Sequence, residues 1–441
     1  SDSRDIEERL NELVVHMENV TQKYLVEYET LEEYNTKAIV QEPYHLVVVA
    51  DAPEHLTDHA FKQLVRIYTQ GEKCGVYALM VVNTTVNPPY GFDLKKIAHS
   101  AYVFSQIQQS WKADSQNLLP ELHDLTLDTS PNPQEVQSWI REHGPQFKVA
   151  MSVKVSREDL MKASGASIDQ LWCADSTDGI SIPLGPSGAA GVRHLEFRTS
   201  SSVTLPPVNA VLVGRPGSGK SNLMHILITN ALHIYGPDEL ELYLLDFKDG
   251  VEFMPYASGN LPHIKVVAIE SERQFGLSVL ERVEAIRVER STLFKSIETS
   301  DLPGYRKKSG AKLPRILVIV DEFQQLFASD DNISRKCHSL LEGLVRLGRN
   351  AGIHTILASQ NLVGNLPKSV LDLISVRIAL QCSVNDAAMV LAQDNTAAAQ
   401  LTRPGEAIYN AASGAKEGNI FFQVALSDDG DRKSQLKAVT Y

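Results

Sequence analysis

The sequence predicts an α/β protein whose larger part is organised around a mostly parallel sheet. Three observations support this class. Strand-length apolar runs alternate with helical patterns over residues 208–426, one of these runs leads into a glycine-rich loop and a helix, and another ends in two acidic residues. Of the 441 residues 43% are apolar, so the chain can bury a core of ordinary size and has room for two or three domains.

The expected strands of the larger part are short and apolar throughout. Such runs are typical of strands that are buried on both faces of a parallel sheet. We expect strands at 208–213, 240–245, 265–268, 315–320, 354–358, 376–382, 406–409 and 420–424, with helices between most of them. The last residues, 427–441, are polar and are expected to form a frayed tail.

The N-terminal part shows the same alternation on a smaller scale. Apolar residues recur every three or four positions over residues 3–34, which predicts one long amphipathic helix. The apolar runs at 46–50 and 77–82 are expected to be strands buried on both faces, with a helix at 61–68 between them. Beyond this part, the polar, proline-rich stretch at 125–134 is the best linker candidate.

Charge and cysteine usage narrow the class of function. The formal net charge of −12 excludes a surface that is basic all over, so a nucleic-acid site would have to be a local basic loop or a channel. The four cysteines lack a C-x-x-C pair, which favours free thiols in a reducing compartment over disulfides or a zinc site. An acidic N-terminus and the short apolar runs predict neither an export signal nor a membrane segment. We expect a cytoplasmic location, with any membrane attachment made through other segments or partners.

A glycine-rich loop determines the chemistry that we expect. The strand at 208–213 runs into the sequence G-x-x-x-x-G-K-S, and the residues that follow have a helical pattern. Glycines let the backbone curl so that successive N–H groups, with the positive end of the following helix, face phosphate oxygens. We predict ATP contacts from Gly214, Arg215, Pro216, Gly217, Ser218, Gly219, Lys220, Ser221 and Asn222.

Individual side chains around this loop have specific predicted roles. Lys220 is expected to reach the β- and γ-phosphates, and the Ser221 hydroxyl to coordinate Mg²⁺. Asp321 and Glu322 end an apolar strand, where a carboxylate must be paired or desolvated. Asp321 suits the outer shell of Mg²⁺, and Glu322 suits a general base that activates water. The alternative is a solvated acidic turn. Gln360 follows another strand of the same sheet and could touch the γ-phosphate or the attacking water.

Taken in order, the motifs resemble the FtsK/SpoIIIE branch of the FtsK–HerA ring ATPases. Besides the glycine loop, the matching segments are 244–253 (LLDFKDGVEF), 261–263 (LPH), 281–290 (ERVEAIRVER), 303–305 (PGY), 319–323 (IVDEF), 347–360 (LGRNAGIHTILASQ), 376–378 (VRI) and 404–409 (PGEAIY). The resemblance covers about residues 205–426. No single segment would name a family, but the ordered series does.

The resemblance implies a RecA-like P-loop ATPase domain that works as a ring, usually a hexamer, with ATP and Mg²⁺ bound between neighbouring subunits. Arg290 stands where the family places the arginine that reaches the neighbour's γ-phosphate, and a guanidinium from another subunit would stabilise the charge on the transferring phosphoryl group. The alternative is that Arg287 and Arg290 form surface ion pairs with glutamates of the same predicted helix.

The N-terminal part resembles the back half of the ATPase domain. Residues 45–53 match 315–323, and residues 75–83 match 352–360. In this alignment Ala52 takes the place of Glu322 and Asn83 that of Gln360, and no glycine loop precedes them. We therefore predict a degenerate, partial RecA-like domain without hydrolysis, which packs beside the active domain. The alternative is that any parallel α/β domain gives such matches by chance. The repeat also suggests a chain cut from a longer protein.

The predicted organisation has four parts. They are a degenerate ATPase half at 1–125, a linker and small α+β region at 126–204 with antiparallel strands in 172–204, an active ATPase domain at 205–426 and a polar tail at 427–441.

The sequence offers three hypotheses for what such a motor acts on. The loop at 305–315 is basic on an acidic chain, which favours double-stranded DNA as the partner, because phosphate contacts need such a local patch. For the loop itself, the alternative is a solvated surface turn. For the motor, the alternative is a type VII secretion-like ATPase that moves polypeptides, since those enzymes share the motifs and often carry degenerate units. A third hypothesis is a regulatory or defence ATPase that senses DNA.

Overall fold

The computed structural model describes residues 3–87, 90–107, 110–113, 124–125, 131–150, 154–199, 207–248, 252–257, 260–268, 272–362 and 368–440. The chain forms two compact units, Ser1–Val153 and Lys154–Tyr441, and each is described by itself. The division lies C-terminal to the linker candidate at 125–134 and within the linker and small α+β region expected at 126–204. No helix among the described residues is long and apolar enough to cross a membrane.

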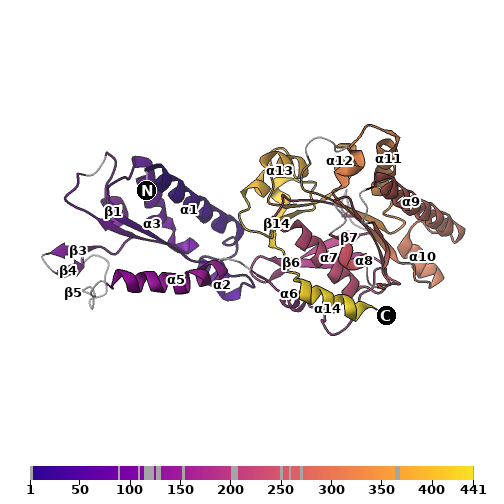
Figure 1. Cartoon of the computed structure of the whole chain (residues 1–441), viewed down its shortest axis with the longest axis horizontal. Helices are drawn as coiled ribbons and strands as arrows, with labels where there is room; N and C mark the ends of the chain where they lie inside the picture. The colour runs from indigo at the N-terminus through magenta and orange to yellow at the C-terminus, as the bar shows by residue number, and fades with distance from the viewer. Residues whose placement is uncertain are drawn as a thin grey trace. The chain divides into compact units, whose positions relative to one another are not determined.

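The second unit contains the predicted α/β sheet (Figure 1). Its eight strands are β8 (Ala210–Val213), β9 (Leu240–Asp246), β10 (Ile264–Ala268), β11 (Arg315–Asp321), β12 (Ile353–Ser359), β13 (Val376–Leu380), β14 (Glu406–Asn410) and β15 (Asn419–Gln423). Their order in the sheet is β10-β9-β11-β12-β8-β13-β14-β15, and all pairs are parallel up to β13, after which β14 and β15 run antiparallel. The prediction of a mostly parallel sheet is confirmed.

Helices cover both faces of this sheet. They are α6 (Arg157–Ala163), α7 (Lys220–Ile234), α8 (Met254–Ala257), α9 (Arg273–Ser296), α10 (Leu302–Ser309), α11 (Asn332–Leu347), α12 (Lys368–Asp372), α13 (Val384–Val390) and α14 (Asp429–Val439). Helices α9 and α11 pack on one face, and α7 packs on the other together with the antiparallel hairpin of β6 (Gly179–Ser187) and β7 (Gly191–Arg198). The hairpin confirms the antiparallel strands expected within 172–204.

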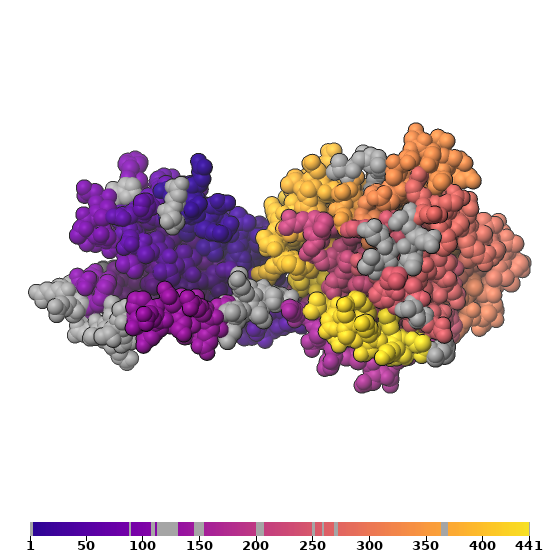
Figure 2. Space-filling model, viewed as in Figure 1, coloured from indigo at the N-terminus to yellow at the C-terminus, as the bar shows by residue number. Residues whose placement is uncertain are grey.

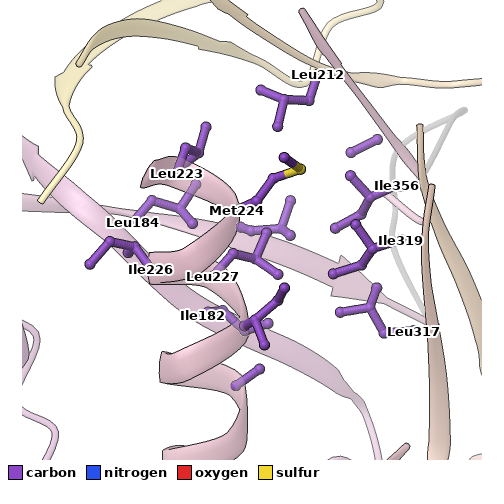
Figure 3. Close-up of a cluster of buried hydrophobic side chains, with 14 of the residues drawn as sticks. Ile182, Leu184, Leu212, Leu223, Met224, Ile226, Leu227, Leu317, Ile319 and Ile356 are labelled. Atoms are coloured by element: carbon purple, nitrogen blue, oxygen red, sulfur yellow. The ribbon is translucent and has the colours of Figure 1, made fainter. Parts of the chain in front are cut away.

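Helix α7 has an apolar surface on almost every side, because it lies between the sheet and the hairpin. Figure 3 shows Met224 and Leu227 of α7 directed toward strand residues such as Ile319, and Ile182 and Leu184 of β6 belong to the same buried cluster. Each such fully buried side chain contributes roughly 1.5–3 kcal/mol to folding. This packing holds in place the helix that directly follows the glycine loop.

The C-terminal residues differ from the prediction of a frayed tail. Residues 429–439 form α14, which begins after Asp428, whose side chain accepts hydrogen bonds from two backbone N–H groups of the first turn. Val439 is buried in the same core as α7, and Leu436 packs against it. In Figures 1 and 2 the helix, drawn in yellow, lies on the surface of the second unit. A polar segment can thus form an ordered helix when a few apolar residues reach the core.

The first unit is built on a pair of parallel strands, β1 (His45–Ala52) and β2 (Val76–Val82). Its other elements are α1 (Ser3–Lys23), α2 (Leu31–Lys37), α3 (Asp58–Gln70), α4 (Lys95–Ala98), β3 (Phe104–Ile107), β4 (Ser110–Ala113), β5 (Asp124–Leu125) and α5 (Pro133–Ala150). The helix predicted over 3–34 is divided into α1 and α2.

The prediction that β1 and β2 are buried on both faces is wrong. One face carries the apolar sides of α1 and α3, but the other is open. Its side chains are strongly exposed: Leu46 68%, Val48 60%, Tyr77 47%, Leu79 55% and Val81 50%. The apolar runs looked like central strands because both faces are apolar, yet only one face is covered within the described residues.

The strand pairing of the two units can be compared with the predicted repeat. His45 pairs with Val76 in the first unit, and Ile316 pairs with Ile353 in the second. When Val76 is matched with Ile353, the start of β1 puts Asp51 at the place of Glu322. The register of β1 shifts between Val49 and Ala52, however, and Ala52, which pairs with Val82, then takes the predicted place. Asp51 and Glu322 both have left-handed backbone, with φ of 57° and 50°. The match of Ala52 with Glu322 stays a prediction.

Candidate nucleotide-binding site

The predicted loop lies between the end of β8 and the first turn of α7. Gly217 and Gly219 have φ values of 79° and 101°, which L side chains rarely adopt. A Cβ atom on Gly219 would lie 3.0 Å from the backbone nitrogen of Gly405, so this glycine also allows a close approach of two chain segments. The loop therefore curls directly into the helix N-terminus, where unpaired N–H groups favour an anion.

Lys220, Asp321 and Glu322 come together at the carboxyl edge of the sheet. The Lys220 ammonium is buried and donates to an oxygen of Asp321 and, at 2.8 Å, to Oε1 of Glu322. The parallel order of β8 and β11 brings the loop and the two acids to the same edge, as the sequence predicted. The alternative of a solvated acidic turn is excluded, because both carboxylates are about 95% buried.

The two acids differ in their protonation behaviour. Burial raises the pKa of Asp321 to about 6, with Glu322 and Asp246 as like-charged neighbours, although Lys220 opposes the shift. For Glu322, burial also favours the neutral form, but the charge and hydrogen bond of Lys220, with bonds from Gln324 and Gln360, outweigh it and lower its pKa. Glu322 is thus a carboxylate at neutral pH, as a general base must be.

Gln360 reaches the site through its backbone. Its N–H donates to Oε2 of Glu322 at 3.3 Å, and the side-chain amide of Gln324 donates to the same oxygen at 2.5 Å. The predicted contact of the Gln360 side chain with phosphate or water stays a prediction. The structure shows instead that two neighbours orient the predicted base.

Other predicted residues occupy different positions around the loop. The Ser221 hydroxyl donates to Oε2 of Glu252 at 2.8 Å. The side-chain amide of Asn222 donates to the carbonyl of Ala425 at 2.7 Å, so it anchors the chain end after β15 and is not free for a phosphate. Arg215 is exposed and donates to the Gln381 side chain at 2.7 Å.

Arg290 is buried within the second unit. Its side chain is 5% exposed and donates to the carbonyl of Ala351 at 2.7 Å, and burial lowers its pKa to about 10. It joins α9 to the turn before β12, and its predicted role toward a neighbouring subunit stays a prediction. The alternative of surface ion pairs holds for Arg287, which contacts Glu284 at 2.7 Å, and not for Arg290.

The basic loop also differs from its prediction. Arg306 is buried and pairs with Glu239 at 2.7 Å, and Lys312 contacts Asp238 at 2.5 Å. Arg315 is fully buried and donates to the carbonyl of Thr177 at 2.6 Å, among other bonds. The Lys308 ammonium donates to the carbonyls of residues 297 and 298. Arg306 and Arg315 thus serve the fold, whereas Lys307, Lys308 and Lys312 are exposed.

Glu252 is the site residue that the sequence analysis missed. It follows Asp246 by six residues within the segment 244–253, which had been used only to recognise the family. The sequence could have indicated this residue, because it is a carboxylate in a loop that follows a strand, and such loops meet at the same edge of a parallel sheet.

The residues fit ATP and Mg²⁺. The Ser218 hydroxyl is buried and makes no hydrogen bond within the described residues, which is costly unless a ligand supplies a partner. Lys220 is a cation whose carboxylate partners can be exchanged for phosphate oxygens, and Ser221 and Asp321 offer the hard oxygen atoms that Mg²⁺ prefers.

The fold and this cluster define a P-loop ATPase domain with a RecA-like architecture. Residues 176–363 match the model of the FtsK/SpoIIIE family, so this stretch is an FtsK/SpoIIIE-type ATPase domain, as the motifs predicted.

Curated relatives are secretion proteins. The ESX secretion system protein EccC of Geobacillus thermodenitrificans is 27% identical over 56% of this chain and 16% of its own length. The ESX-1 secretion system protein EccCa1 of Mycobacterium tuberculosis is 29% identical over 44% of this chain and 27% of its own length. The chain thus matches less than a third of either relative.

A solved structure supports the fold. The cytoplasmic domain of the type VII secretion ATPase EccC from Thermomonospora curvata superposes with a TM-score of 0.53, at 22% identity, over 66% of this chain and 35% of that one.

Proposed function

We propose that the chain is an ATP-hydrolysing motor of the secretion type, which uses the site around Lys220 to act on polypeptides. The observation that carries the proposal is the contact of Lys220 with Asp321 and Glu322 beside the glycine loop. One cation and two carboxylates with different pKa values lie where a γ-phosphate and an attacking water would be placed.

The proposed roles follow from the side chains. Lys220 exchanges its carboxylate partners for phosphate oxygens and stabilises their negative charge. Glu322, oriented by Gln324 and the N–H of Gln360, accepts a proton from the attacking water. Ser221 and Asp321 are the residues that would hold Mg²⁺, which supplies charge neutralisation at the phosphates when it is bound.

Two observations favour a polypeptide over DNA as the polymer. The curated relatives are named as secretion proteins. In addition, Arg306 and Arg315 are buried and have partners inside the unit, so two of the five cations of the basic loop are not free for phosphate contacts. We propose a homo-oligomeric ring, a hexamer for the family, and a cytoplasmic site of action, as for the solved relative.

Phosphate release from ATP tests the proposal. Wild-type protein should hydrolyse ATP, and Lys220→Ala should lower turnover by about 100-fold or more, because it removes the phosphate cation. Linear duplex DNA at low salt should not stimulate turnover, and labelled duplex should not bind the Glu322→Gln variant in ATP. An array of synthetic peptides should contain sequences that this variant retains with ATP and releases with ADP.

Two results would reject the proposed polymer. They are strong stimulation by duplex DNA that is lost when the exposed Lys307 is changed to alanine, and a peptide array without any nucleotide-dependent binding. Wild-type protein without ATP turnover in any assembly state would reject the motor itself.

A further inference from the structure

A third acidic residue, Glu252, lies against the metal-binding end of the predicted site. It belongs to the turn between β9 and α8, and its backbone N–H donates to Oδ2 of Asp246 at 3.0 Å. The other oxygen of Asp246 accepts the N–H of Lys248 at 2.8 Å. Asp246 is buried at the end of β9, so it fixes both ends of the turn relative to the sheet.

The Glu252 carboxylate uses both of its oxygens on helix α7. Oε2 accepts the hydroxyl of Ser221 at 2.8 Å, and Oε1 accepts Nε2 of His225 at 3.0 Å. These two residues stand one helical turn apart, on the same side of α7. Since a carboxylate only accepts, His225 donates through Nε2, and its Nδ1 then accepts from the Tyr256 hydroxyl at 2.8 Å. The Glu252 carboxylate is therefore held by two side chains of α7, one on each oxygen.

The direction of the Ser221 hydrogen bond has a consequence for metal binding. A hydroxyl has one hydrogen and two lone pairs, and a metal ion binds through a lone pair. Because Glu252 takes the hydrogen, the lone pairs of Ser221 are left for a cation.

The charges around the loop favour a cation as well. Asp246, Glu252, Asp321 and Glu322 lie close enough to interact electrostatically around the single ammonium of Lys220. Negative charge in excess repels a free triphosphate and attracts a divalent cation that accompanies it.

We propose that Glu252 is a positioning residue that makes nucleotide binding depend on a divalent cation, by orienting the Ser221 hydroxyl and adding a negative charge beside it. The inference rests on the proposed nucleotide site and deepens it. Residues that hydrogen-bond to a metal-binding side chain typically contribute 10- to 100-fold to metal affinity. Loss of Glu252 should therefore weaken cation-dependent binding while leaving the phosphate cradle in place.

Titration of a fluorescent, non-hydrolysable ATP analogue tests this, with saturating Mg²⁺ or with EDTA, followed by titration of Mg²⁺ at fixed analogue. Glu252→Gln should raise the half-saturating Mg²⁺ concentration about tenfold or more. In EDTA the same variant should bind the analogue as tightly as wild type or more tightly, because one repelling charge is gone. A general structural defect would weaken both.

Matched variants separate the outcomes. Glu241→Gln removes a carboxylate from the other end of β9, where it pairs with Lys265, and should leave the Mg²⁺ dependence unchanged. In a Ser221→Ala background, Glu252→Gln should have little further effect, because Glu252 acts mainly through that hydroxyl. If Glu252→Gln proves unstable, Glu252→Asp keeps the charge and should retain most of the Mg²⁺ dependence in EDTA-controlled titrations.

The inference is overturned if Glu252→Gln, or Glu252→Asp in its place, weakens binding equally with and without Mg²⁺, or if Glu252→Gln matches Glu241→Gln. If the wild-type chain binds no analogue under either condition, the proposed function itself is wrong. If the wild-type chain binds Mg²⁺ and the analogue but the Glu252 variants behave like wild type, only the inference is rejected. The proposed function then stands.

Discussion

The strand pair β1–β2 of the first unit and the pair β11–β12 of the second have the same parallel pairing and similar apolar sequences, but different surroundings. Both pairs carry helices on one face. On the other face the second unit has α7 and the β6–β7 hairpin, whereas Val48 and Leu79 of the first unit are 60% and 55% exposed. Apolar sequence therefore shows that a strand can be buried, and only the neighbouring elements decide whether it is.

The difference extends to the acidic turn after each strand. Glu322 is buried against Lys220, which comes from the glycine loop before α7. Asp51 has the same backbone conformation but is exposed, and no glycine loop lies in the described residues of its unit. A carboxylate at this turn becomes a candidate catalytic group only when a cation and a phosphate cradle stand opposite it.

Lysine substitutions at matched positions give the largest expected effect. Ile319 and Val48 occupy equivalent positions in the two strand pairs. Ile319→Lys buries an unpaired ammonium and should reduce the free energy of unfolding of the second unit by about 4 kcal/mol or more. Val48→Lys should change stability by no more than about 0.5 kcal/mol, because its side chain is already in water. Denaturant unfolding followed by circular dichroism measures both. Equal losses would show that the face of β1–β2 is covered in solution.

Amide substitutions at the two acidic turns come next. Glu322→Gln should lower ATP turnover by roughly 100- to 10,000-fold, because it removes the general base and keeps the shape. Asp51→Asn should leave turnover unchanged, and phosphate release at saturating ATP compares the two variants. Normal hydrolysis by Glu322→Gln would refute its assignment as the base, and a loss in Asp51→Asn would give the first unit a part in catalysis.

The pH dependence of folding gives the smallest of these effects. Tyr77 is exposed where its match, His354, is fully buried, and burial, together with Arg315, lowers the pKa of His354 to about 3. This histidine stays neutral in the folded state but is protonated below pH ~6.5 in the unfolded chain. Its contribution to stability is therefore complete above pH ~6.5 and is lost toward pH 3, by up to about 1.4 kcal/mol per pH unit.

Denaturant unfolding between neutral and mildly acidic pH checks this sign. His354→Gln should flatten the decline below pH ~6.5 relative to wild type, whereas substitution of the exposed His55 should not. A steeper decline in His354→Gln would contradict the assignment of a neutral buried imidazole.

The sequence predicted the second unit well because local and long-range signals agreed there. The glycine loop, the apolar strands and the two acids each point to one sheet edge, and the parallel order places Lys220 beside Glu322. The register shift of β1 before Ala52 could not be predicted, because strand pairing is invisible in a run of similar apolar residues.

The sequence did not predict the burial of several charged side chains, because their partners lie far along the chain. Arg290, Arg306 and Arg315 look like surface cations in the sequence, yet each is buried and bonded to groups about 60 or more residues away. Burial of arginine depends on carbonyl and carboxylate acceptors that only the folded unit supplies. For the same reason Glu252, whose partners are on α7, was not recognised as part of the site.

The stoichiometry of nucleotide binding tests the central claim most directly. Calorimetric titration with a non-hydrolysable ATP analogue and Mg²⁺ should give one site per chain, which Lys220→Ala abolishes while the chain stays folded, as a cooperative unfolding transition shows. Two sites per chain, or binding that survives Lys220→Ala, would contradict the account that the loop before α7 grips the triphosphate and that the first unit has no such site.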